Sequence, residues 1–253
     1  AVWADMIIGD YNYLFDPFVK LQRFADTGRS LLLVDEAHQL SGRVSQMLST
    51  EIAIDSKAAL LESPSDDFSH AANEVFSVIR GLAQSAGGDG ARVIERPLQL
   101  EAAAQRLIEA VEVLQLFDDL DPQSLELYFA CLRWVRSLEW FEEREYQHLS
   151  IEHAQGFMIQ RLCLDASAYI SDVVHGHAAS IRFSGTVSPL ALYQRLHGCA
   201  EDEDERAVSP FSATQSAVLV VRDIPTYFRR RRDSLPMLSE LVNTLVEARP
   251  GRY

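Results

Sequence analysis

The chain has 253 residues, 47% of them hydrophobic, so it can bury a sizeable core, and disorder over its whole length is excluded. Its formal charge is −14, from 23 Lys and Arg residues against 37 Asp and Glu residues. An acidic chain is a poor non-specific binder of nucleic acid, so any DNA contact requires a local basic patch or groups outside these residues.

The spacing of the cysteines and the length of the apolar runs indicate the cellular compartment of the protein. Cys131, Cys163 and Cys199 are far apart and form neither a CxxC pair nor a cluster with zinc spacing, so we expect buried, reduced thiols in a cytoplasmic protein. No apolar run reaches membrane-spanning length, and the start AVWADMIIGD lacks the layout of a signal peptide. Both ends have the character of cuts within a longer protein.

Residues 1–48 predict the first part of an α/β domain. A short strand is expected at 4–9, then a loop or helix start, then a short helix after Pro17. Residues 31–34 are an apolar run between turn signals, typical of a central parallel strand. This strand leads directly into Asp35-Glu36-Ala37-His38, and a helix with Ser41 as its cap follows.

Residues 49–156 predict a mostly helical insertion. Helices are expected at 67–86, 98–118 and 123–149, and the sequence SAGGDG forms a flexible loop after the first. Apolar residues in the second and third helices alternate spacings of three and four, as in packed helix pairs. We therefore expect antiparallel helical hairpins in this region.

The strand pattern returns at residue 157. Residues 157–200 predict a second part of the same domain, and 201–253 a linker and the start of another domain. The elements expected are strands at 157–165, 178–189 and 216–221, helices at 165–176 and 189–198, and a loop and helix over 224–248. The predicted fold class is α/β, a partial parallel sheet interrupted by the helical insertion.

Polar groups follow two of these strands, at the sheet edge where ligands bind in open α/β folds. Asp35 is suited to hold Mg²⁺, which takes one or two carboxylates, and Glu36 to activate water in nucleoside triphosphate hydrolysis. His38 could report the nucleotide state to a neighbouring segment. Ser184-Gly185-Thr186 brings hydroxyl groups to the same edge. The alternatives are a solvated acidic pair and an ordinary turn, and the apolar run before Asp35 favours function.

These motifs resemble, in the same order, those of the XPD/DinG-like superfamily-two DNA helicases. LLLVDEAH (31–38) matches helicase motif II, the Walker B motif, and FSGTVSPLALYQRL (183–196) matches motif III. GDYNYLFDP (9–17) and CLDAS (163–167) accompany them. That family fills the gap between motifs II and III with a helical arch domain, which residues 49–156 would form. The segment from Ile224 onward resembles the lead-in to the second motor domain.

The resemblance implies a RecA-like P-loop NTPase fold and an ATP-dependent 5′-to-3′ helicase of DNA repair or replication. The oligomeric state stays open, and we expect a monomer. Its cofactors would be ATP and Mg²⁺, its partner single-stranded or forked DNA, and Ser184 and Thr186 would couple the nucleotide state to DNA movement. The sequence has no GxxxxGK[ST] phosphate loop, no four-cysteine iron–sulfur segment and no arginine-finger motif. We therefore expect these residues alone not to hydrolyse ATP, and an iron–sulfur cluster to be held by residues upstream of residue 1.

Two further segments are candidate DNA contacts. Tyr11, Asn12 and Tyr13 follow a predicted strand, where aromatic rings can stack on bases and the amide can bind phosphate. The alternative is core aromatics beside a loop-forming Asn. Arg229 and Arg230 lie in the basic run FRRRR, which could contact a DNA backbone, pair with the acidic residues 201–205, or line a domain interface.

A different class of function stays open. The chain could be a catalytically idle, helicase-derived protein-interaction module, which its acidic charge favours and the intact Asp35 and Glu36 oppose. A phosphate loop and four spaced cysteines encoded upstream of residue 1 would support the helicase. His175 and His177 flank Gly176 in a predicted solvated turn, because a metal site would need more ligands.

Overall fold

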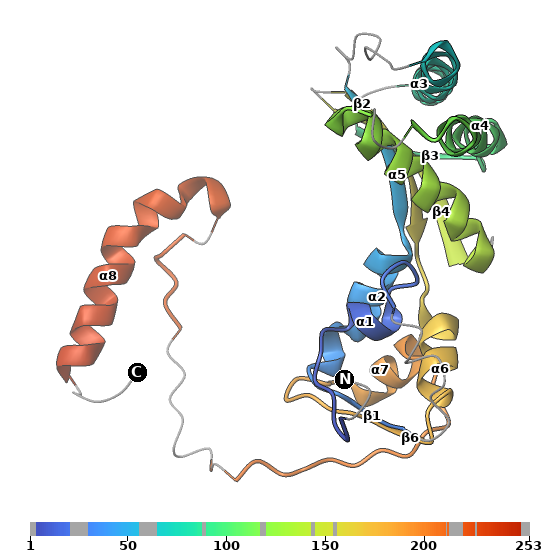
Figure 1. Ribbon diagram of the computed structural model, residues 1–253. Helices are drawn as coiled ribbons and strands as arrows, with labels where there is room; N and C mark the ends of the chain where they lie inside the picture. The colour runs from blue at the N-terminus through green and yellow to red at the C-terminus, as the bar shows by residue number, and fades with distance from the viewer. Residues whose placement is uncertain are drawn as a thin grey trace. The chain divides into compact units, whose positions relative to one another are not determined.

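A computed structural model describes most of the chain, in ten segments. These are residues 4–20, 30–55, 65–87, 90–116, 120–142, 145–153, 156–210, 212, 220–225 and 227–248. The chain divides into two units, residues 1–202 and 203–253, and each is described by itself. The first unit contains two sheets with their helices (Figure 1).

A two-stranded parallel sheet organises one part of the first unit, which we call the parallel lobe. Strand β1 (Leu31–Val34) pairs with β6 (Ala179–Arg182), residue by residue along their whole length. The other elements of this lobe are α1 (Asn12–Phe15), the 3-10 turn η2 (Ala37–Gln39), α2 (Leu40–Leu48), α6 (Ser167–His175) and α7 (Leu190–Leu196). One face of α2 and of α6 packs with Val34 in a shared core, so the sheet is anchored mainly through this residue.

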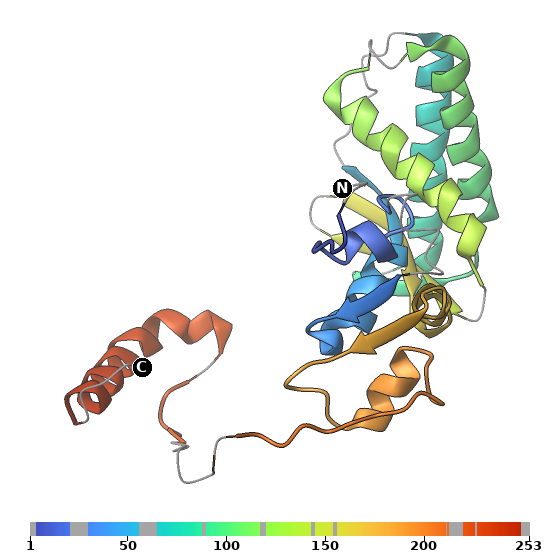
Figure 2. The same ribbon diagram turned by 60° about the horizontal axis from the view of Figure 1, so that its bottom comes forward.

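A four-stranded antiparallel sheet organises the other part, which we call the antiparallel lobe. Its strand order is β2-β5-β4-β3. The elements are β2 (Thr50–Asp55), α3 (Asp66–Ala86), β3 (Gly90–Ile94), α4 (Leu98–Leu114), α5 (Pro122–Arg136), the 3-10 turn η4 (Ser137–Trp140), β4 (Tyr146–His153) and β5 (Gly156–Cys163). The three long helices, teal and green in Figure 2, bury their apolar faces with Ile52, Ile54 and Ile159 of the sheet.

Side-chain caps define where two of these helices begin. The hydroxyl of Ser65 accepts a hydrogen bond from the Phe68 amide at 3.1 Å, at the start of α3. A carboxylate oxygen of Asp121 accepts from the amides of Gln123 at 2.8 Å and Ser124 at 3.1 Å, at the start of α5. Such caps satisfy amides that have no partner within the helix. The helices predicted at 67–86 and 98–118 are confirmed, although the second ends at Leu114, and the third begins at Pro122, one residue before its predicted start.

The predicted helix at 123–149 is wrong in its second half. Helix α5 ends at Arg136, and after η4 the chain forms strand β4. The buried face of β4 carries Tyr146, His148 and Ser150, which are polar or amphipathic residues. The alternation of apolar and polar residues that marks a half-buried strand is therefore hidden in this segment. The insertion therefore contains the three long helices, which make up most of its described residues, and strands that the prediction lacked.

The strand predicted at 157–165 forms, but not in the parallel sheet. It is β5, which pairs antiparallel with β2 on one side and β4 on the other. In the part of the chain that the structure describes, the parallel sheet consists of β1 and β6 alone. The α/β class is therefore confirmed in its coarse form, a mixed α/β architecture, with a smaller parallel sheet than expected.

Several boundaries near the N-terminus also differ from the predictions. Residues 4–9 form no strand and are exposed, and the residues after Pro17 form a turn as far as the description extends. Helix α2 begins at Leu40 and directly follows η2, so Ser41 lies inside the helix and does not cap it. The strand predicted at 178–189 ends at Arg182.

The second unit contains helix α8 (Arg231–Ala248), preceded by the 3-10 turn η7 (Phe228–Arg230), which confirms the helix expected there. The predicted strand at 216–221 lies outside the described residues except for 220 and 221, which are not in a strand. None of the described helices combines the length and the apolar character needed to cross a membrane.

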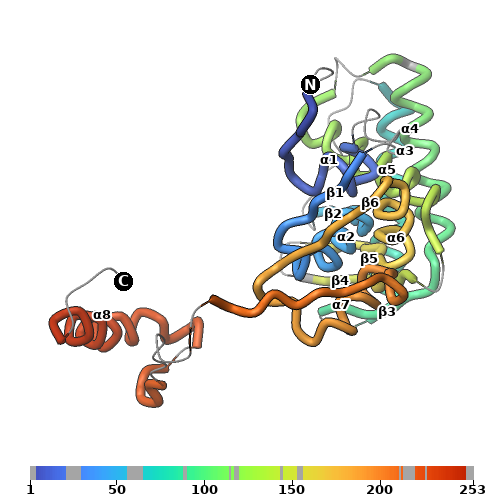
Figure 3. The backbone as a smooth tube through the Cα atoms, turned by 90° about the horizontal axis from the view of Figure 1, so that it is seen from below, coloured from blue at the N-terminus to red at the C-terminus, as the bar shows by residue number. Residues whose placement is uncertain are grey.

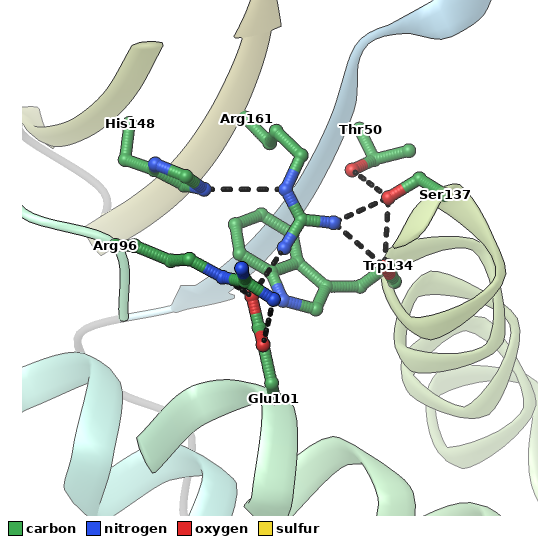
Figure 4. A network of polar contacts seen from close by, with 7 residues as sticks. All are labelled: Thr50, Arg96, Glu101, Trp134, Ser137, His148 and Arg161. Carbon is green, nitrogen blue, oxygen red and sulfur yellow. Dashed lines mark hydrogen bonds and ion pairs between the residues drawn. The ribbon is translucent and has the colours of Figure 1, made fainter. Parts of the chain in front are cut away.

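A buried arginine ties the antiparallel sheet to its helices (Figure 4). Arg161 of β5 is 0% exposed and donates hydrogen bonds to Glu101 of α4 at 2.7 Å and to the Trp134 carbonyl of α5 at 2.9 Å. It also donates to Ser137 and, through Nε, to His148 Nε2 at 3.2 Å. A buried charge requires such partners, so this guanidinium holds strands β4 and β5 and helices α4 and α5 in a single arrangement.

Candidate functional site

The carboxyl ends of β1 and β6 lie side by side, as the sequence predicts (Figure 3). The Phe183 amide donates to the Val34 carbonyl at 2.9 Å, and the Ala37 amide donates to the Phe183 carbonyl at 3.1 Å. These two hydrogen bonds continue the sheet beyond the strand ends. They therefore bring residues 35–38 next to residues 183–186.

Four side chains meet at this edge, and we call them the strand-end cluster: Glu36, His38, Ser184 and Thr186. The Ser184 hydroxyl is at its centre, 2.8 Å from His38 Nδ1, 3.3 Å from Glu36 Oε2 and 3.3 Å from the Thr186 hydroxyl. His38 Nδ1 also lies 3.2 Å from Glu36 Oε2. A carboxylate, an imidazole and two hydroxyls therefore share one hydrogen-bonded network.

Backbone geometry presents Glu36 to solvent. Its φ is 48° and its ψ is 41°, the left-handed region that non-glycine residues seldom adopt. The turn buries Ala37 and leaves the Glu36 side chain 61% exposed, two residues after the buried strand residue Val34. Unusual backbone conformations of this kind concentrate at functional sites.

Asp35 is exposed and lies next to the cluster. Its Oδ1 accepts the Glu36 amide at 2.7 Å, which fixes the orientation of the carboxylate. Its backbone carbonyl accepts the Tyr11 hydroxyl. An accessible carboxylate is the oxygen ligand that Mg²⁺ takes, so this side chain fits the ion expected from the sequence.

Tyr11 contacts the turn through its hydrogen bond to the Asp35 carbonyl. It is one of the three residues at 11–13 that the sequence predicts as DNA contacts. Its ring is half-buried beside Phe15 and under the Arg43 guanidinium, 5.1 Å away. Burial raises the pKa of its hydroxyl, with Arg43 acting in the opposite direction. Asn12 and Tyr13 lie in α1, and Tyr13 is exposed. The expectation that these residues follow a strand is wrong, because residues 4–9 form none.

Arg229 and Arg230 belong to the second unit. Both lie exposed in η7, and Arg230 Nε is 3.6 Å from an Asp233 carboxylate oxygen three residues further on. Of the acidic residues 201–205, Asp202 forms an ion pair with Arg182 within the first unit.

Residues that the sequence analysis missed surround the strand ends. Arg43 of α2 forms an ion pair with Asp10 at 3.2 Å and covers Tyr11. His197, after α7, is buried, and burial together with the Arg182 charge lowers its pKa to about 4. A lone histidine at a helix end carries no pattern by which the sequence could have marked it.

The arrangement can hold a cation on Asp35, orient a water beside Glu36, and transmit a change at Glu36 through Ser184 to β6. The three cysteines are free, buried thiols and fewer than the four that an iron–sulfur cluster takes. No protein-family model matches the chain, and no curated protein matches it.

Proposed function

We propose that the chain is part of an ATP-dependent DNA helicase that resembles the XPD/DinG-like family and moves 5′ to 3′ along single-stranded DNA. The observation that carries the proposal is the contact of Glu36 with Ser184, beside Asp35 and Thr186, at adjacent ends of parallel strands. Two motifs that lie far apart in the sequence thereby share one sheet edge, the place where α/β proteins bind nucleotides.

In this proposal each group has a distinct role. Asp35 would hold Mg²⁺, which when bound neutralises charge on the β- and γ-phosphates. Glu36 orients and deprotonates the attacking water, and its exposed carboxylate is accessible for this role. The Ser184 hydroxyl, 3.3 Å from Glu36 Oε2 and 2.8 Å from His38 Nδ1, passes a change at the nucleotide to the segment after β6.

The phosphate-binding loop would come from another segment, which would also cover the parallel sheet. Parallel sheets are normally buried on both faces. Leu31 is 74% exposed, Leu33 63% and Ile181 60%, so the sheet presents apolar side chains to solvent. This exposed face supports completion of the fold by residues beyond the 253, and the gene sequence upstream decides whether a phosphate loop is encoded there.

The direct test is Glu36→Gln in a polypeptide that joins these residues to that phosphate loop. We expect ATP turnover to fall by more than about 100-fold, because a general base contributes this much, while nucleotide binding is retained. Glu51→Gln is the matched control, since Glu51 is an exposed glutamate on β2 that contacts Gln160 at 3.2 Å. Turnover near that of the control would show that Glu36 is not the base.

The second candidate is an idle protein-interaction module, which the charge of −14 favours. It predicts that the upstream gene segment encodes no phosphate loop and that Glu36→Gln changes no nucleotide-dependent property. The helicase proposal predicts the opposite for both, so the same two observations separate the candidates.

A further inference from the structure

A second group of polar side chains lies away from the strand-end cluster, where the end of α6 meets the segment after α7. His175, Cys199 and Asp202 place one nitrogen, one sulfur and one oxygen atom within 4.8 Å of one another. The residues come from two separate stretches of the chain. The proximity therefore results from the fold and not from a local sequence motif.

The imidazole of His175 is oriented as a metal ligand. Its Nδ1 lies 3.0 Å from the Ser171 carbonyl oxygen and 3.1 Å from the Ser171 hydroxyl. The carbonyl only accepts hydrogen bonds and the hydroxyl can also accept, so the tautomer with the proton on Nδ1 suits both neighbours. Nε2 then holds the free lone pair, and it faces Asp202 Oδ1 at 3.5 Å. Metal-binding histidines typically donate their other ring N–H to a carbonyl in this manner, which fixes the ring and its tautomer.

Asp202 is held in place by a second group. Arg182 of β6 binds its Oδ2, which leaves Oδ1 directed at His175. The guanidinium also places a positive charge beside this carboxylate. A carboxylate whose second oxygen is bonded to a neighbouring side chain is the usual state of a metal ligand.

The turn before Cys199 presses this residue against α6. Gly198 has a φ of 65°, and a Cβ at this position would clash with the Ser167 backbone oxygen, so only glycine allows the close approach. Cys199 is buried, and its thiol donates to the His197 carbonyl at 3.1 Å. The sulfur is therefore fixed beside the other two ligand atoms.

We propose that His175 Nε2, Cys199 Sγ and Asp202 Oδ1 bind a zinc ion, with water in the fourth position. A set of one imidazole, one thiolate and one carboxylate suits a borderline-soft ion such as Zn²⁺ and is unsuited to Mg²⁺, which takes oxygen ligands. On binding, the thiol proton passes to solvent and the ligand atoms close by a few tenths of an ångström to about 1 Å. The ion would fasten residues 199–202 to α6, independently of the proposed ATPase.

The test uses Co²⁺ as a spectroscopic substitute for Zn²⁺ on the purified 253-residue chain. We expect one Co²⁺ per chain, a thiolate-to-cobalt charge-transfer band, visible bands of tetrahedral intensity, and displacement by Zn²⁺. Cys199→Ser should abolish the charge-transfer band. His175→Ala and Asp202→Asn should each weaken Zn²⁺ binding more than about tenfold, measured by competition with a chromophoric chelator.

The matched control is His177→Ala. His177 makes the same bond to a carbonyl four residues back, 2.9 Å from Val173, but does not belong to the group of three. Its variant should bind Co²⁺ and Zn²⁺ as the unsubstituted chain does, and so should Cys163→Ser. Because the His175 side chain is 56% exposed, His175→Ala will fold even if Cys199→Ser does not. An absent charge-transfer band, or affinity unchanged in His175→Ala, would overturn the site.

Discussion

The two lobes of the first unit contrast in how completely their sheets are covered. In the antiparallel lobe, Ile52 and Ile159 are fully buried under three helices, and even a guanidinium is enclosed. In the parallel lobe, Leu31, Leu33 and Ile181 face solvent from a sheet of two strands. The first lobe meets its own packing requirements within these residues. In the parallel lobe, hydrogen bonds order the carboxyl ends of β1 and β6, where the strand-end cluster lies, but apolar side chains of the sheet stay exposed.

This contrast separates an enclosed group of polar side chains from an accessible one. The Arg161 guanidinium is enclosed, and its partners come from different elements, so its role is to specify one packing arrangement. The strand-end cluster is accessible and its members contact one another across only two strand ends. A buried network stabilises a fold, whereas an exposed one is available to a ligand.

The largest expected effect comes from breaking the buried network. Glu101→Gln removes the carboxylate that faces Arg161 and leaves a buried guanidinium without its counter-charge. We expect the free energy of unfolding to fall by about 4 kcal/mol, measured by urea denaturation. Glu74→Gln is the control, because Glu74 pairs with Arg106 at the surface and exposed pairs contribute little. Equal, small changes in the two variants would mean that the buried pair does not organise the antiparallel lobe.

The next effect is a pH dependence that both lobes share. Burial, together with Arg161, lowers the pKa of His148 to about 4 from 6.5, and burial with Arg182 does the same for His197. The unfolded chain takes up these protons near pH 6.5 and the folded chain only near pH 4. Stability is therefore lost as the pH falls through that window, by about 3 kcal/mol for each histidine.

The measurement is urea denaturation at pH 7 and at pH 4.5. His148→Gln and His197→Gln should each reduce the difference between the two pH values, and the double variant should reduce it by the sum, because the histidines lie in different lobes. A pH dependence identical to that of the unsubstituted chain in both single variants would show that neither histidine is kept neutral by the fold.

The smallest effect tests the uncovered face. Leu33→Ala should change the free energy of unfolding of the 253-residue chain by less than about 0.5 kcal/mol, as for other exposed sites. Val93→Ala, an equally exposed strand residue of the antiparallel lobe, is the control. In a longer polypeptide that covers the parallel sheet, Leu33→Ala should cost about 2 kcal/mol or more, and Val93→Ala should not. A large loss in the 253-residue chain itself would show that Leu33 is already covered.

The parallel pairing of β1 and β6 was predictable because both signals are local. An apolar run followed by Asp35 and a run followed by Ser184 indicate two strand ends, and carboxyl ends of parallel strands meet at one edge. The partner of β5 was not predictable in this way. Its sequence, FMIQRLC, indicates a buried strand but contains nothing that distinguishes a parallel neighbour from the antiparallel β2 and β4.

Sites assembled from distant residues were harder still to predict. The sequence showed His175 and Cys199 but gave no reason to place them together, since their proximity depends on the tight turn at Gly198 and on Arg182 holding Asp202. Arg161 was hidden for a different reason. An arginine within an apolar strand is normally expected to face solvent, and its burial depends on partners from α4 and α5.

The connections into and out of the antiparallel lobe run next to each other. Thr50, the first residue of β2, pairs with Arg161 near the end of β5, and the Ser49 hydroxyl accepts the Cys163 amide at 3.0 Å. The chain therefore leaves the parallel lobe before β2 and returns to it after β5 at the same place. The antiparallel lobe is thus inserted through a single point of the parallel lobe, and the pairing of β1 with β6 holds Asp35 near Ser184 from outside the insertion.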